Sequence, residues 1–203
     1  CAASRSVKLS VPPRLPAARA AAFLAAQRGW LEQQATLRVP PPVAFVAGGR
    51  LPYRGAQLLL AAGSGRSVLR AGDRLLVPGG TDAFAGRVRR WLEREARQLL
   101  VAETEALAGR LGIGDVRVRL GDPAGRWGSC GPRASINYSW RLVMAPDFVR
   151  AAVVAHEVAH LRHPDHGRDF WRLAAELLGG PHAPDRAWLS ANGPMLHAQG
   201  ADR

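Results

Sequence analysis

Hydrophobic residues in the first 80 positions come in short runs that glycine and proline residues separate. A strand at Ser6–Val11 and a helix at Pro16–Gln33 are predicted first, followed by four short strands. These four strands are Val43–Ala47, Gln57–Ala61, Ser67–Arg70 and Arg74–Val77. Glycine-rich turns between them are typical of a small antiparallel sheet. We therefore expect residues 1–80 to form a small β-rich N-terminal module with one helix.

From residue 81 onward, longer helical segments alternate with short strands. An apolar stripe at helical spacing predicts a long helix over residues 81–111. Pro146 is well placed to open an apolar helix that runs through His160, and Pro164 cannot continue that helix. The other predicted elements are strands at 116–120, Arg126–Cys130 and Ala134–Trp140 and a last helix at Arg168–Leu178. The expected fold class is α+β, with residues 81–203 as a second domain containing a short antiparallel sheet.

Composition limits the classes of protein to which this chain can belong. Hydrophobic residues make up 47% of the 203 residues, which is enough for a packed core. No run approaches the roughly 20 apolar residues of a membrane-spanning helix, so we expect no membrane partner. The two cysteines, Cys1 and Cys130, cannot form a disulfide framework, which favours a reducing, cytoplasmic compartment. A mature lipoprotein would also begin with cysteine, but we expect Cys1 to be a truncated start.

The charge of the chain is strongly positive and unevenly placed. The formal net charge is +12, and residues 1–120 carry 19 basic against 8 acidic side chains. Such a basic half is able to bind the phosphates of nucleic acid. There is no dense basic run, however, so an arginine-rich solvated surface also explains the charge. Nucleic acid is therefore an alternative partner that the charge alone does not establish.

The segment His156-Glu157-Val158-Ala159-His160 has the HExxH spacing of a zinc site. Residues i and i+4 share one face of a helix, so both imidazoles can reach a single ion. Glu157 lies beside them and is the candidate general base for a water molecule that the metal activates. The preceding segment is strongly apolar, and polar side chains on such a buried helix need a partner such as a metal. The motif predicts a catalytic Zn²⁺ site with Glu157 as the catalytic residue.

A catalytic zinc site needs a third protein ligand and keeps a fourth position open. His166 follows His160 by six residues, the spacing of metzincins, but His163 replaces the glycine at which those chains turn. Glu176 on the next predicted helix is the competing ligand. Weaker candidates are Asp165, Asp169 and His163.

Other marked residues have an ordinary interpretation beside a functional one. Cys130 is a candidate zinc ligand, as cysteine is in peptide deformylases, but it also suits a small buried position in a strand. Tyr138 is a candidate oxyanion donor or a core residue. His182 and His197 are expected to be ordinary loop or surface histidines.

Several motifs of the second half resemble those of a known family. They are Arg126–Cys130, Ile136–Leu142, Ala145-Pro146, His156–His163 and His166 with Phe170-Trp171. Their order and spacing resemble the small bacterial YgjP-like zinc metallopeptidases, which are akin to SprT-like and Wss-type proteases and share a minimal zincin core. The resemblance covers roughly residues 115–175, and the first half resembles the family only in outline.

The resemblance implies that His156, His160 and His166 are the zinc ligands and that Glu157 is the general base. It also implies that a sheet edge borders the active site and binds an extended peptide. The substrate-binding candidates on that edge are Arg126, Trp127, Gly128, Ser129 and Cys130. The implied activity is endopeptidase-type hydrolysis of a peptide or protein substrate, with residues 81–203 as a zincin-like metallopeptidase domain. One departure is Pro164-Asp165, where the family often has an asparagine before the third histidine.

Two other functions stay open on the sequence. The first is a DNA-associated metalloprotease, or a nucleic-acid-binding module whose zinc is structural, and it draws on the basic half. The second is a deformylase-like hydrolase of small amides, which predicts Cys130 among the metal ligands.

Overall fold

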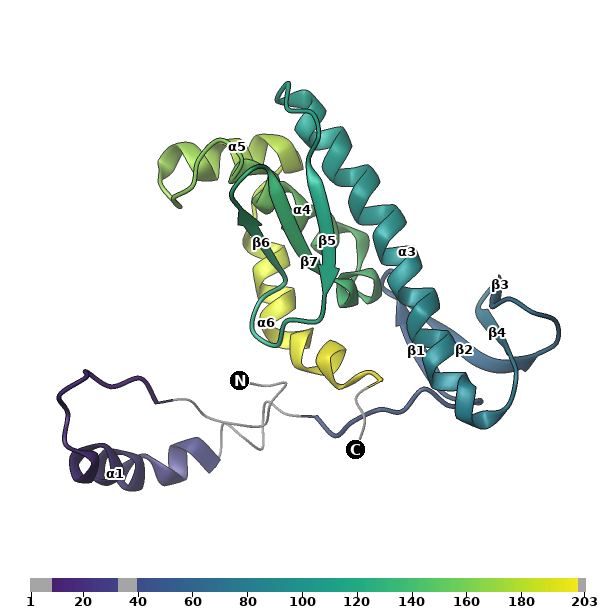
Figure 1. The fold of residues 1–203 in the computed structure, drawn as a ribbon, viewed down its shortest axis with the longest axis horizontal. Helices are drawn as coiled ribbons and strands as arrows, with labels where there is room; N and C mark the ends of the chain where they lie inside the picture. The colour runs from purple at the N-terminus through teal and green to yellow at the C-terminus, as the bar shows by residue number, and fades with distance from the viewer. Residues whose placement is uncertain (1–8, 33–39, 201–203) are drawn as a thin grey trace.

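The computed structural model describes residues 9–32 and 40–200. The first half of the strand expected at Ser6–Val11 therefore lies outside the described residues, and residues 9–11 do not form a strand. Helix α1 (Ala17–Ala26) follows Pro16, as expected, and residues 28–32 are helical again. None of the α1 residues is buried, and Figure 1 shows the helix lying apart from the rest of the molecule.

The first sheet contains β1 (Arg50–Tyr53), β2 (Ala56–Gly63), β3 (Leu69–Ala71) and β4 (Arg74–Pro78) in the order β1-β2-β4-β3. It is mixed rather than antiparallel, because β2 and β4 run parallel. The chain passes from β2 to the short, exposed edge strand β3 and returns by a hairpin, which gives β4 the direction of β2. The run Val43–Ala47 forms only an isolated bridge between Val43 and Gln199, and β1, which contains Pro52, was not expected.

Helix α3 (Thr81–Arg110) connects the two sheets, and in Figure 1 it runs diagonally between them. Its bounds match the predicted helix at 81–111, because buried residues recur along this segment at helical spacing. They are Phe84, Val88, Trp91, Leu92, Ala96, Leu100, Thr104 and Ala108. Through this stripe the buried side chains of both sheets belong to one continuous core. A domain boundary at residue 80 stays a prediction.

The second sheet contains β5 (Arg117–Gly121), β6 (Gly128–Gly131) and β7 (Ser135–Ser139) in the order β5-β7-β6. The β6–β7 pair is the expected antiparallel hairpin, but β5 pairs parallel with β7, so this sheet is mixed too. The α+β class is confirmed. β6 lies at an edge of the sheet and packs beside the helix that carries the HExxH motif.

That helix is α4 (Asp147–Ala159), which follows the short 3-10 helix η1 (Trp140–Met144). Helix α5 (Arg168–Leu178) packs on α4 and ends as predicted at Gly179, whose φ of +78° suits glycine. A further helix, α6 (Ala183–Ala198), also packs on α4 and was not expected. Its sequence contains Asn192-Gly193-Pro194, which usually marks a turn, yet the helix continues through Pro194.

No helix of residues 9–32 and 40–200 is both long and apolar enough to cross a membrane.

Candidate metal centre

Three histidines gather where α4 ends and the following loop turns back. His156 and His160 lie one turn apart on α4, and His166 comes from the loop before α5. Their ligating nitrogens all lie within 4.8 Å of one another, and Nε2 of His156 is 3.2 Å from Nε2 of His166. The structure thus brings together the three residues that the sequence suggested as metal ligands.

The end of α4 orients His160. Helix α4 ends at Ala159 with His160 as its C-cap, and turn hydrogen bonds carry the chain on to His163. Pro164, which has no N–H, then prevents any further helical turn. Nδ1 of His160 lies 3.0 Å from the carbonyl oxygen of His163, to which it donates as N–H. This tautomer leaves the lone pair of Nε2 for a metal, which is the usual arrangement of a ligating histidine. His163 therefore contributes its backbone to the centre.

The donor set fits zinc. With Zn–N bonds of about 2.0–2.1 Å, two ligands of a tetrahedral site lie roughly 3.4 Å apart, close to the 3.2 Å between His156 and His166. The ligating nitrogens of the triad lie at most 4.8 Å apart, and small ring movements bring the widest pair to about 3.4 Å. Three neutral imidazoles with a fourth position open are the donor set of catalytic zinc.

Burial keeps two of the ligands in the neutral, ligating form. Burial, and to a smaller extent the neighbouring imidazoles, lower the pKa of His156 to about 4. Burial also lowers the pKa of His160, although its bond to the His163 carbonyl opposes this. Phe170 packs against both rings, at centroid distances of 4.9 Å from His156 and 4.4 Å from His160, and so restricts their rotation.

Glu157 lies between α4 and the edge strand β6. Its side chain is buried, and the carboxylate accepts a hydrogen bond from the backbone of Cys130. Burial raises the pKa of Glu157 to about 7, while this bond and the charge of Arg126 act in the opposite direction. A Cβ atom on Gly128 would lie 2.5 Å from Oε1 of Glu157. Only glycine leaves room at this position for the carboxylate.

The backbone of β6 has a defined hydrogen-bonding direction. Ser139 donates its N–H to the carbonyl of Trp127, so by the alternation of an antiparallel pair Ser129 also faces β7. The polar backbone groups of Gly128 and Cys130 then point away from the sheet. The N–H of Cys130 is used by Glu157, which leaves the Cys130 carbonyl and both backbone groups of Gly128 facing outward.

The remaining substrate-binding candidates lie in different surroundings. Arg126 is exposed, and Ser129 is partly buried. The indole of Trp127 packs on α6, where it stacks on His197 at 4.8 Å and lies 3.0 Å from the position of a Cβ on Gly193. Trp127 therefore joins β6 to α6.

The competing ligands lie elsewhere. Glu176 is exposed on α5, and Asp169 pairs with Arg172 at 2.8 Å. Neither these two nor Asp165 and Cys130 belong to the group that the three histidines form within the described residues. Tyr138 is fully buried, and its hydroxyl lies 3.1 Å from that of Thr104, so it is a core residue.

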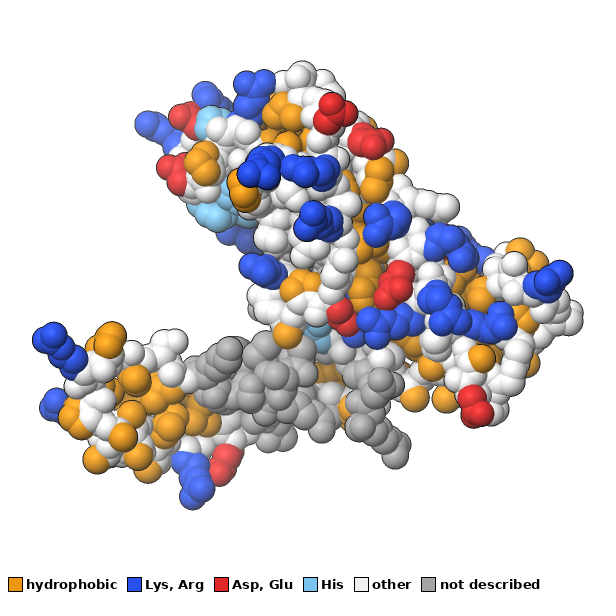
Figure 2. Space-filling view, in the orientation of Figure 1, with side chains coloured by type: hydrophobic (Ala, Val, Ile, Leu, Met, Phe, Trp, Pro, Cys, Tyr) orange, Lys and Arg blue, Asp and Glu red, His pale blue; other side chains and the backbone are white. Residues whose placement is uncertain are grey.

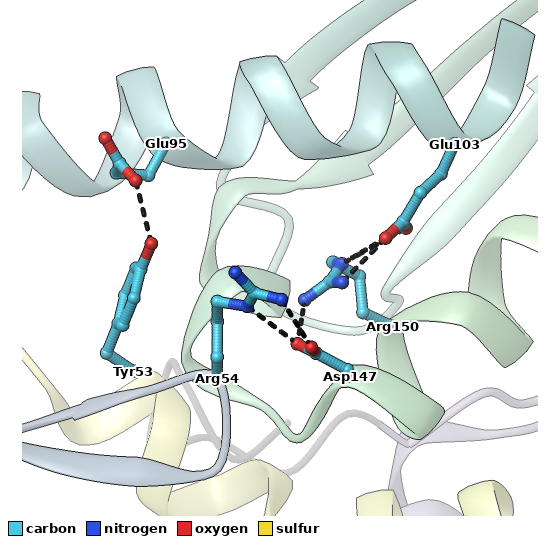
Figure 3. Close-up of polar contacts among 6 residues, drawn as sticks. All are labelled: Tyr53, Arg54, Glu95, Glu103, Asp147 and Arg150. Carbon is cyan, nitrogen blue, oxygen red and sulfur yellow. Dashed lines mark hydrogen bonds and ion pairs between the residues drawn. The ribbon is translucent and has the colours of Figure 1, made fainter.

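A network of charged side chains fixes the start of α4 (Figure 3). Arg150 is 3% exposed and forms ion pairs with Glu103 of α3 and Asp147, each with a contact of 2.6 Å. Arg54, at the β1–β2 turn, makes a second bidentate pair with Asp147 at 2.6 and 3.0 Å. The pKa of Asp147 falls to about 2, chiefly because of its hydrogen bonds with Arg54 and also with Arg150. The first sheet and α3 thus hold the helix that carries the centre.

His182 was expected to be an ordinary loop or surface residue, and this was wrong. Its side chain is buried at the N-cap of α6, and its ring centroid is 6.4 Å from that of His156. Little in the sequence pointed to this, because α6 itself was not expected. The available signal was Asp185, three residues later, which suits the first turn of a helix.

Comparison with known proteins agrees with this centre. The family model of the YgjP-like metallopeptidase domain matches residues 1–192, so the chain belongs to the YgjP-like family. The match begins well before residue 115, where the recognisable motifs start, and it includes the first sheet. Searches of the curated proteins and of the solved structures find no match. The chain is therefore a metallopeptidase by family, and such a family implies a metal ion. The three histidines are a group of side chains that could hold one.

Proposed function

We propose that this YgjP-like metallopeptidase is a zinc-dependent endopeptidase whose ligands are His156, His160 and His166. The observation that carries the proposal is the position of Glu157, whose carboxylate lies buried between this triad and an exposed sheet edge. A carboxylate beside a metal site can act as the general base for a metal-activated water and as the general acid for the leaving amine.

The zinc ion, when bound, supplies Lewis acidity that polarises a carbonyl and makes a water molecule acidic near neutral pH. Glu157 accepts the proton of the attacking water at its carboxylate and passes it to the amine that leaves. The hydrogen bond from the Cys130 backbone holds the carboxylate in one orientation during both transfers. Phe170 packs against all three histidine rings, and Trp171 packs against two of them. His166 itself stays exposed, so the centre is open to solvent on its side.

The outward-facing backbone groups of β6 suit a peptide substrate in extended conformation. Such a peptide adds a strand to an exposed edge through main-chain hydrogen bonds. On β6 it would pair with the N–H and carbonyl of Gly128 and with the carbonyl of Cys130. This pairing places the peptide backbone beside Glu157, because Gly128 packs directly on that carboxylate. Recognition through the main chain favours peptide bonds over isolated small amides.

The experiment compares two Glu→Gln variants. Glu157→Gln removes the base but keeps the side-chain volume, so we expect zinc content equal to that of the parent and loss of casein or peptide hydrolysis. Glu176→Gln is the matched control, since Glu176 is exposed on α5 and should leave both zinc and hydrolysis unchanged. Parent-like hydrolysis by Glu157→Gln would refute the mechanism. Loss of zinc from Glu176→Gln, with retention in His166→Ala, would refute the ligand set.

A second candidate function, binding of nucleic acid, is favoured by one observation. Arg90, Arg94 and Arg97 are exposed along one face of α3, and none of them makes an ion pair within the described part of the chain. Figure 2 shows further basic side chains spread over the face that α3 and both sheets present. We propose that an Arg90→Ala/Arg94→Ala/Arg97→Ala variant reduces the salt dependence of DNA binding, because each lost phosphate contact lowers the slope. A parent protein that shows no DNA binding at low salt would exclude this function.

A further inference from the structure

The start of α6 contains two buried polar side chains that each have one atom without a hydrogen-bond partner among the described residues. His182 and Asp185 are 6% and 5% exposed, although aspartate is almost never fully buried unless it is paired. Nδ1 of His182 is 3.7 Å from Oδ2 of Asp185, which is longer than a hydrogen bond. Nε2 of His182 and Oδ1 of Asp185 are shielded from solvent, and residues 9–32 and 40–200 provide neither with a hydrogen-bond partner. Because such atoms are costly to bury, each of them needs an explanation.

The position of His182 and Asp185 beside the metal centre suggests an explanation for these two unpartnered atoms. The ring of His182 lies 6.4 Å from the ring of His156 and 6.0 Å from that of Trp171, measured between centroids. Arg186, one turn further along α6, stacks over Trp171 at 4.9 Å. The start of α6 therefore forms a wall of the centre.

His156 has one ring nitrogen that the triad does not use. Its Nε2 faces His166, so Nδ1 is the atom that carries hydrogen when Nε2 binds a metal. A ligating histidine almost always donates this second N–H to a carboxylate, a carbonyl or a water. His160 donates its own to the His163 carbonyl. For Nδ1 of His156, the described residues provide no such hydrogen bond.

We propose that His182 is a positioning residue for His156. Asp185 favours the tautomer of His182 that has its hydrogen on Nδ1, which leaves the lone pair of Nε2 as an acceptor. Nε2 then accepts the Nδ1–H of His156, directly or through one water, when the metal is bound. A direct bond would place the two ring centroids roughly 5 Å apart, so a small ring rotation or a bridging water closes the gap.

The burial of Nε2 decides between this role and direct action on the substrate. A group that donates to the substrate must be open to the space where the substrate binds, and Nε2 of His182 is shielded from solvent. A merely structural role at the helix terminus is the other alternative. It accounts for Asp185, since an acidic residue in the first turn is favourable, but not for the unpartnered imidazole nitrogen.

The test measures zinc affinity of the purified full chain by competition with a chromophoric chelator. His182→Phe keeps an aromatic ring against Trp171 but has no acceptor, and we expect zinc to bind 10–100-fold more weakly. His182→Gln keeps a polar acceptor and should recover most of this loss. His197→Phe is the matched control, because His197 lies on the same helix but stacks on Trp127, and its zinc affinity should equal that of the parent.

The inference about His182 rests on the proposed function, but different results would overturn the two proposals. A parent protein that binds no zinc at the triad would overturn both. Zinc binding by the parent, with equal affinity in His182→Phe, would overturn only the role of His182. A fall of kcat in His182→Phe at unchanged zinc affinity would also overturn that role, since His182 would then act on the substrate. If His182→Phe does not fold, Asp185→Asn, measured the same way, decides the question. Weaker zinc binding would support the role of His182, and affinity equal to that of the parent would overturn it.

Discussion

Replacing Gly128 with alanine tests whether the β6 edge positions the catalytic carboxylate. The backbone of Gly128 does not have a positive φ, so alanine is acceptable there for conformational reasons. The new methyl group would, however, lie 2.5 Å from Oε1, 2.6 Å from Cγ and 2.7 Å from Cδ of Glu157. The effect of the substitution is therefore a direct collision with one side chain.

The size of the effect follows from these distances. An ordinary contact of a Cβ atom is about 3.5 Å, so Glu157 or the strand must move by about 1 Å. A displacement of that size in a catalytic group reduces the rate by about 100-fold. Overpacking also destabilises a folded protein by about 1–3 kcal/mol, which lowers the melting temperature of a chain of this size by roughly 2–12 °C. The histidine triad does not contact Gly128, so zinc content should be unchanged.

Gly131→Ala is the matched control, because it adds the same methyl group to the same strand. A Cβ atom there meets only the Ser135 carbonyl at 3.5 Å, an ordinary contact. We expect this variant to hydrolyse peptides at the parent rate. The assay is kcat for a fluorogenic peptide, together with zinc content and melting temperature for both variants. Parent-like kcat in a folded Gly128→Ala would show that Glu157 does not act from the position that the structure gives it.

Two other predictions concern α4, the helix that carries the centre, and a third concerns an exposed ion pair on α5 that serves as their control. Arg150→Ala removes a buried partner of two carboxylates and should cost about 3 kcal/mol of unfolding free energy in urea titration, near the lower limit for a buried pair because Asp147 stays half-exposed. Arg172→Ala breaks an exposed pair and should cost less than about 0.5 kcal/mol, so equal losses in the two variants would contradict the network. Because the folded pKa of Asp147 is lowered to about 2, its contribution is present above the unfolded pKa of about 4 and is lost as the pH falls towards 2. Asp147→Asn should therefore lose less stability than the parent between pH 5 and pH 3, and an identical loss would contradict the ion pair.

The sequence predicted best those features that depend on local chemistry. The spacing of His156 and His160 places both on one helix face, and Pro164 ends the helix before His166, so the triad follows from neighbouring residues. Helix α3 and the end of α5 at Gly179 were also predicted within a few residues, because periodicity and helix-ending residues are local signals. The family relationship was recognised from motifs of the second half alone.

The features that the sequence did not predict depend on contacts between distant segments. Both sheets are mixed, since strand direction depends on how the chain returns to the sheet and not on the alternation within a strand. Helix α6 was missed because Gly193-Pro194 indicates a turn, whereas in the structure Trp127 packs closely on Gly193. A larger residue at 193 would collide with that indole. The glycine that weakens the helix locally is thus explained by a strand more than sixty residues earlier.

Contacts between distant segments also account for Gly128 and His182, whose places in the structure differ from what their sequence context suggests. Gly128 resembles a turn-forming residue next to Ser129, yet its missing side chain is the space that the Glu157 carboxylate occupies. His182 follows Gly-Gly-Pro, a context typical of a surface loop, yet its side chain is buried and its ring centroid lies 6.4 Å from that of His156. The centre that we propose is formed by the HExxH motif on α4, His166 from the loop before α5, the β6 edge and the start of α6. Strand β6 and helices α5 and α6 all pack on α4, and this packing brings residues from distant parts of the sequence beside the motif.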